Sequence, residues 1–327
     1  MRRLAHIVIA LVCSACSVEF NEEAYTPLCW ERASCVRYLN LMAATEDWMD
    51  NASAPVDADD LQRWNQGIES VDGVFGFIGV DEISDDDKLE RLQFLKEHEN
   101  LIREIGGLVD VELRKILPRV LGRNSSEQRE NIRVVVAPFL QMTNASVGTA
   151  NDSDIVLVIA PDRLAFNVAE RGQSLTWVRT VVAHELTHAS HFAMVPYSTT
   201  FRRADPMHRS LWVEGLALHG SIRATDTPRS LADIIGESNA AICERTGRQL
   251  AADYRNDMED ADQSEIWWAD RGADPRAYGI VTPGYCVAFL VMESLMAQHD
   301  FEDLLLLPPA EAYPMLTLAL EQLSALN

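Results

Sequence analysis

Two histidines and a glutamate within residues 181–191 are the side chains best suited to chemistry in this chain. His184 and His188 are four residues apart, so on a helix both imidazoles project from one face and can reach a single metal ion. Glu185 follows the first histidine. Its carboxylate can face the same cleft without binding the ion, and can take a proton from a water molecule held there. The pattern therefore predicts metal-assisted hydrolysis.

Glu214 is the predicted third ligand. A catalytic zinc ion needs three protein donors and one open position for water. Glu214 lies 26 residues after His188, a separation expected if a second helix returns antiparallel to the first and offers the carboxylate across a cleft. Gly215 and Ala217 would let the two backbones approach closely, and Gly220 would end this second helix.

His191 is the rival ligand because it shares the face of His184 and His188. An uninterrupted helix rises about 1.5 Å per residue and would carry it about 10 Å beyond His184, too far for one small ion. The metzincin pattern solves this with a glycine turn and a later histidine, but Met194 stands where that histidine would be. We therefore expect His191 to support the site or to lie at the helix end.

The element that must position the two histidines is a helix beginning after Ser174, a residue suited to capping a helix N-terminus. One side of the expected helix is apolar and can be buried while the histidines face a cleft. This side is formed by Leu175, Val178, Val181, Val182, Ala183 and Leu186.

Residues 181–188 together with 212–217 resemble the gluzincin clan of zinc peptidases. The Glu-Gly-Leu-Ala ending is similar to a bacterial family of predicted zinc-dependent proteases that pair HExxH with an EGLA segment. The resemblance covers about residues 131–300 and is strong only at the two motifs. It implies a zincin-like catalytic domain with a small β-sheet packed on the active-site helix, Zn²⁺ as cofactor, and a peptide or protein substrate.

The chain departs from the thermolysin-like pattern at Leu218. In that pattern an aspartate at this position orients one of the histidines, so here another group must do so, or the interaction is missing. Peptide hydrolysis also needs a donor for the negative charge on the carbonyl oxygen, which a phenol or imidazole supplies in related enzymes. Tyr285 is the first prediction and Tyr278 the second, with His219 and His299 as weaker alternatives; a packing role is the alternative for each.

The first 15 residues predict an export signal: Arg2 and Arg3 precede an apolar run over residues 4–13 that is too short for a stable membrane anchor. Residues 12–17 resemble a bacterial lipobox in which Cys16 would be acylated. Cys13 occupies a place usually held by leucine, so ordinary cleavage, or no lipid, stays an alternative. The predicted location is the bacterial cell envelope, with a membrane contacted only through the lipid.

Of the six cysteines, Cys13 and Cys16 belong to the signal segment and four remain. An even number in an exported chain predicts two disulfides. Sequence neighbourhood favours the pairs Cys29–Cys35 and Cys243–Cys286, with free buried thiols as the alternative. The formal net charge is −22, or −24 without residues 1–15. Such an acidic surface repels phosphate backbones, so nucleic acid is not an expected partner.

With 47% hydrophobic residues, the chain can bury a substantial core. The expected fold class is α+β and mainly helical, because helical patterns dominate. We expect an N-terminal helical region over residues 16–130, with helices at 35–49, 85–105 and 112–121 and a break at Gly106-Gly107. The zincin-like metallopeptidase domain is expected over 131–327. Runs 132–140 and 154–160 are its predicted strands, and 143–152 a loop between them.

Two functions fit these expectations. The first is an exported zinc-dependent peptidase in which Glu185 activates a water molecule at an ion held by His184, His188 and Glu214. The alternative is a non-catalytic surface lipoprotein that uses a zincin-like fold as a binding module. Hydrolysis of a non-peptide amide is a third possibility that the residues do not separate from peptide cleavage.

Overall fold

The chain is mainly helical with one small mixed sheet, which confirms the α+β class. The computed structural model describes residues 19–31, 34–150, 154–195, 206–225, 230–268, 279–280 and 282–325. The predicted signal at 1–15 and the predicted acylation site Cys16 lie outside these ranges and stay predictions. In the described part of the chain, no helix is both long and apolar enough to cross a bilayer.

The chain divides into two compact units, one ending at Glu185 and the other beginning at Leu186. This division falls inside helix α8 (Leu175–Met194). The boundary expected at residues 130/131 instead falls within the first unit. The reason is strand pairing across that boundary, because β2 (Ser34–Asn40) pairs in parallel with β3 (Ile132–Val136).

The sheet of the first unit has five strands in the order β1-β2-β3-β5-β4. β1 (Thr26–Glu31) pairs antiparallel with β2, β3 pairs in parallel with β5 (Asp154–Ile159), and β4 (Ala145–Ala150) pairs antiparallel with β5. All of β3 and nearly all of β5 are buried. Their β-branched residues suit strands covered on both faces, as the sequence predicts.

Three local expectations for this unit are wrong. Residues 35–49 form β2 and then helix α1 (Met42–Asn51) instead of one helix. Residues 145–150 form β4 instead of a loop, because pairing with β5 overrides the weak strand preference of alanine, serine and glycine. The glycine pair Gly106-Gly107 lies within helix α5 (Glu99–Val120), where a Cβ at Gly106 would lie 2.8 Å from Met42 Cε.

The first run of apolar residues leaves the sheet at Val136, earlier than predicted, because a buried carboxylate holds the following turn. The backbone N–H groups of Phe139 and Gln141 donate to the two carboxylate oxygens of Asp162 at 3.2 and 2.6 Å. Leu140 and Gln141 adopt positive φ angles of 48° and 62°, which are unfavourable for side chains with a Cβ. Burial raises the pKa of Asp162 to about 6.

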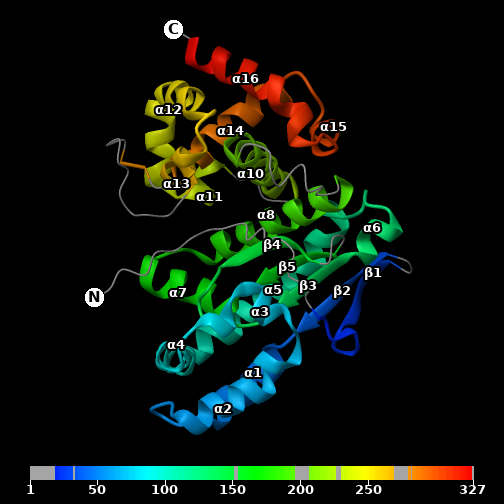
Figure 1. The fold of residues 1–327 in the computed structure, drawn as a ribbon, viewed down its shortest axis with the longest axis vertical. Helices are drawn as coiled ribbons and strands as arrows, with labels where there is room; N and C mark the ends of the chain where they lie inside the picture. The colour runs from blue at the N-terminus through cyan, green and yellow to red at the C-terminus, as the bar shows by residue number, and fades with distance from the viewer. Residues whose placement is uncertain are drawn as a thin grey trace. The chain divides into compact units, whose positions relative to one another are not determined.

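The remaining helices of the first unit lie around its sheet and along α1 (Figure 1). A capping box at Asp57 begins α2, the Ser84 hydroxyl caps α4, and a capping box at Ser125 begins α6. These interactions satisfy N–H groups that a helix leaves unbonded at its start. The bounds are α2 (Ala58–Gly67), α3 (Val74–Ile78), α4 (Asp85–Glu97), α6 (Ser126–Glu130) and α7 (Pro161–Arg171).

The second unit is helical in its described residues. Helices α10, α12, α14 and α16 pack on one another (Figure 1), with α14 against both α10 and α12. The bounds are α10 (Pro206–Arg223), α11 (Leu231–Ile235), α12 (Glu237–Asp257), α13 (Ser264–Trp268), α14 (Pro283–Met296), α15 (Phe301–Leu305) and α16 (Pro309–Ala325).

Both predicted disulfides are present. Cys29 and Cys35 occupy directly paired positions of β1 and β2, and Cys243 joins α12 to α14 through Cys286. The free-thiol alternative is therefore excluded in this structure. Two disulfides suggest an oxidising or extracellular environment, because reducing compartments keep cysteine thiols in their reduced form.

Candidate metal centre

Helix α8 carries both histidines of the motif. The Ser174 hydroxyl accepts a hydrogen bond of 3.1 Å from the Trp177 backbone N–H, which confirms Ser174 as the N-cap. The apolar side of α8 anchors it, since Val178, Val182, Ala183 and Leu186 are fully buried. His184 and His188 are also buried, at 8% and 7% exposure. Regular helix geometry over these residues places the two imidazoles one turn apart.

Helix α10 carries Glu214 and is longer than the sequence predicts. It continues through Gly220 to Arg223. The side chain of Trp212 is fully buried, and its indole N–H donates to the Leu307 carbonyl at 3.1 Å. This hydrogen bond ties the first half of α10 to the segment between α15 and α16. Glu214 itself is 14% exposed, so its carboxylate is neither sealed in the core nor free in solvent.

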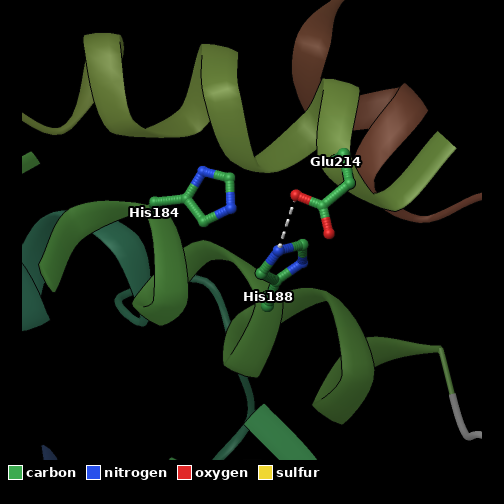
Figure 2. A group of neighbouring side chains, drawn as sticks. All are labelled: His184, His188 and Glu214. Atoms are coloured by element: carbon green, nitrogen blue, oxygen red, sulfur yellow. Dashed lines mark ion pairs between the residues drawn. The ribbon is translucent and has the colours of Figure 1, made fainter. Parts of the chain in front are cut away.

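The structure brings His184, His188 and Glu214 together. One donor atom from each lies within 4.8 Å of the other two. Figure 2 shows the two rings on one helix and the carboxylate coming from the facing helix toward them. The His188 Nε2 and Glu214 Oε2 atoms are 3.5 Å apart. Two ligands at about 2.05 Å from a tetrahedral ion would be about 3.3 Å apart.

These distances and donor types fit a divalent metal ion. Imidazole nitrogens bind zinc, copper, iron and nickel, and a carboxylate completes a three-ligand set that leaves a position open. The His188–Glu214 pair is already near this spacing, and the other donor atoms need a shift of at most about 1.5 Å to reach it. The geometry therefore supports a metal centre and does not by itself select zinc.

Glu185 is half-buried on α8, directly after His184. Its neighbour His184 is a candidate ligand, whereas Glu185 does not belong to the convergent group among the described residues. Its role as a base that acts on a water molecule near the ion stays a prediction.

His191 does not join the group, because its ring is held elsewhere. It is 1% exposed, and its Nδ1–H donates to the Leu305 carbonyl of α15 at 2.7 Å. Burial lowers the pKa of His191 to about 4, so the ring is neutral at neutral pH. The expected role of His191 at the helix end agrees with this contact, which fastens α8 to α15.

Replacing His191 by leucine is expected to leave metal stoichiometry unchanged. The variant should lower the free energy of unfolding by about 1–3 kcal/mol, because the Leu305 carbonyl is left buried without its donor. Urea unfolding and metal analysis of the purified protein measure both quantities. His299→Leu is the matched control, since His299 is exposed and its loss should change neither. A His191→Leu protein without metal would show instead that His191 is a ligand.

The residues predicted to donate a hydrogen bond to the oxyanion have different surroundings. Tyr285 lies in the first turn of α14 and packs edge to face on Trp268, with ring centroids 5.7 Å apart. Its catalytic role stays a prediction. Tyr278 lies outside the described residues. His219 has a different task, because its Nε2–H donates to the Phe289 carbonyl at 3.0 Å and its ring stacks on Phe289.

The glycines of α10 face other neighbours than the sequence suggests. A Cβ at Gly215 would lie 2.9 Å from the Ala288 carbonyl oxygen, so Gly215 admits α14 and not α8. At Gly220 an added Cβ would overlap the side chain of Thr187, so Gly220 is the glycine that admits α8. No local pattern separates these roles, because both lie within one helix and only the neighbours distinguish them.

Leu218 is fully buried and has no side-chain group that can accept a hydrogen bond from a histidine. The departure from the thermolysin-like pattern therefore stands in the folded chain.

A scan against protein-family models gives no match, and searches of curated proteins and of solved structures also give none.

Proposed function

We propose that this protein is an exported zinc-dependent peptidase of the gluzincin type. The observation that carries the proposal is the convergence of His184, His188 and Glu214 within 4.8 Å, with Glu185 beside the first ligand on the same helix. Two imidazoles and one carboxylate are the donor set of catalytic zinc in metallopeptidases. A purely structural zinc site is usually closed by four protein ligands.

His184 and His188 would each bind the ion through one imidazole nitrogen, and Glu214 would bind it through a carboxylate oxygen. When bound, zinc lowers the pKa of a coordinated water toward ~7 and polarises a substrate carbonyl. Glu185 would accept the proton that the attacking water loses and pass it to the amine that leaves. Tyr285 would donate a hydrogen bond to the carbonyl oxygen as negative charge develops on it.

The zincin-like architecture, the lipid anchor at Cys16 and a location in the bacterial cell envelope are parts of the same proposal. The five-stranded sheet and the helix α8 that follows it support the architecture, and the two disulfides support a location outside reducing compartments. Disulfides persist outside the reducing compartments of the cell, and a zinc peptidase can work there. The substrate would be a peptide or protein outside the cytoplasm.

The purified protein is expected to contain about one zinc ion per chain and to cleave members of a mixed peptide library. Removing the metal with 1,10-phenanthroline should lower hydrolysis to background, because without the ion no group lowers the pKa of the attacking water and polarises the substrate carbonyl. Adding zinc should restore it. Metal analysis and mass spectrometry of the cleaved library measure the two properties on one sample.

The second candidate is a non-catalytic surface lipoprotein, and the specific observation in its favour is Leu218. An apolar residue there withdraws one interaction that tunes a ligand histidine in active enzymes. This candidate predicts bound metal without cleavage, or no metal at all. A zinc-loaded sample that leaves every peptide of the library intact would contradict the peptidase and favour the binding module.

A further inference from the structure

Thr187 and Gly220 make a close contact between the two ligand-bearing helices. A Cβ added at Gly220 would overlap Thr187 Cγ2 and lie 2.5 Å from Oγ1 and 2.9 Å from Cβ. Real Cβ atoms essentially never come so near another atom. Thr187 is 2% exposed and Gly220 is buried, so α8 and α10 meet here with no space for one further carbon.

Thr187 lies between the two histidines on α8, three residues after His184 and one before His188. Gly220 lies on α10, six residues beyond Glu214. Figure 2 shows these two helices passing each other with the ligands between them. Because each helix is stiff over one or two turns, the separation at the Thr187–Gly220 contact determines how far the carboxylate lies from the rings.

The side chain of Thr187 is a rigid spacer. A β-branched residue in a helix has few accessible rotamers, and its Cβ is fixed by the backbone, so the close approach cannot be relieved by rotation alone. On the other side of the contact, glycine is a poor helix former compared with alanine. A glycine within α10 is thus favoured by the packing and not by the helix itself.

We propose that Thr187 and Gly220 are positioning residues that set the distance between the histidine pair and Glu214 and thereby the affinity for the metal ion. This inference rests on the proposed function in one respect, since it takes His184, His188 and Glu214 as ligands. It goes beyond it by assigning the ligand spacing to a packing contact. Neither residue touches the ion, so the contact acts only through the helices.

The test compares metal affinity in the Gly220→Ala variant and the parent protein, using Zn²⁺ in competition with a chromophoric chelator. The added methyl group must push α10 away from α8, so affinity should fall roughly tenfold or more, as it does when outer interactions of metal ligands are removed. The visible absorption of the Co²⁺-substituted protein reports ligand geometry directly and should change as well. Neither readout depends on catalysis.

Gly247→Ala is the matched control. It adds the same methyl group between two helices of the same unit, where the Cβ would lie 2.6 Å from Leu290 Cδ1. That atom is the end of a flexible side chain, and neither α12 nor α14 carries a proposed ligand. The control should bind Zn²⁺ as tightly as the parent protein, whatever its thermal stability.

The double variant Thr187→Ala/Gly220→Ala supplies a rescue. Removing Cγ2 and Oγ1 vacates the space that the new methyl group needs, so affinity and the Co²⁺ spectrum should move back toward those of the parent. Unchanged affinity in Gly220→Ala, or a double variant no better than the single one, would overturn the inference while leaving the proposed function intact. A parent protein that binds neither Zn²⁺ nor Co²⁺ would overturn both.

If Gly220→Ala does not yield folded protein, Thr187→Ala takes its place. This variant removes the spacer instead of enlarging it, and a loss of two heavy atoms is tolerated by most cores. Metal affinity should fall several-fold because the two helices no longer have a defined separation. Parent-like affinity and an unchanged Co²⁺ spectrum would then overturn the assignment.

Discussion

Replacing Glu185 by glutamine is expected to lower the rate of peptide hydrolysis by two to four orders of magnitude while the metal stays bound. Glutamine has nearly the same shape as glutamate but cannot accept a proton, so the variant removes the base and little else. A positioned general base typically contributes 10²- to 10⁴-fold, and kcat should fall by about that factor. Glu185 is half-buried beside His184 and outside the convergent ligand group, so zinc content should stay near one per chain.

Three measurements separate this result from a folding defect. Metal analysis should give equal zinc content for the Glu185→Gln and parent proteins, thermal melting should give similar midpoints, and only turnover should differ. Glu170→Gln is the control for the change in charge, because Glu170 is exposed on α7 and should not affect turnover. A Glu185→Gln enzyme as active as the parent would refute the assigned base.

Replacing Glu214 by alanine is expected to remove the metal, and hydrolysis with it. The variant deletes one of three proposed ligands, and two imidazoles on one helix hold zinc much less tightly than a three-ligand set. Loss of affinity should exceed the roughly 10- to 100-fold typical of groups that only orient a ligand. Alanine is the best helix former, so α10 should persist in the variant.

Comparison of metal-free proteins tests whether the loss is local. Without metal, the parent and Glu214→Ala proteins should unfold at similar urea concentrations, whereas added zinc should stabilise the parent alone, because a ligand that binds only the folded state raises its stability. Glu293→Gln is the control, since Glu293 is an exposed carboxylate on α14. Tight stoichiometric zinc in Glu214→Ala would contradict the proposed ligand set and favour another third donor.

Most of the secondary structure near the site follows from local sequence. The helical spacing of apolar residues and the cap at Ser174 predict α8, and the β-branched runs predict β3 and β5, because these signals depend on residues close together in the chain. The disulfide pairs follow from neighbourhood in the chain and are confirmed. The convergence of Glu214 with the two histidines is a long-range arrangement that the motif could only suggest.

The misjudged segments share one physical cause, which is that tertiary neighbours outweigh local preference. β4 forms from small residues because β5 offers a ladder of hydrogen bonds. Gly106-Gly107 remains helical, because the missing Cβ at Gly106 lets the Met42 side chain pack against the helix backbone.

By itself the sequence determined the chemical nature of the candidate centre, because donor types and a four-residue spacing on a helix depend only on local geometry. It also determined the helix that carries them and both disulfide pairings. Only the tertiary structure decided that Glu214 faces the histidines, that His191 is fastened to Leu305, and that Gly220 admits α8 whereas Gly215 admits α14. These are contacts between residues distant in the chain, and packing against a neighbour, unlike helix periodicity, is not encoded in any short stretch of residues.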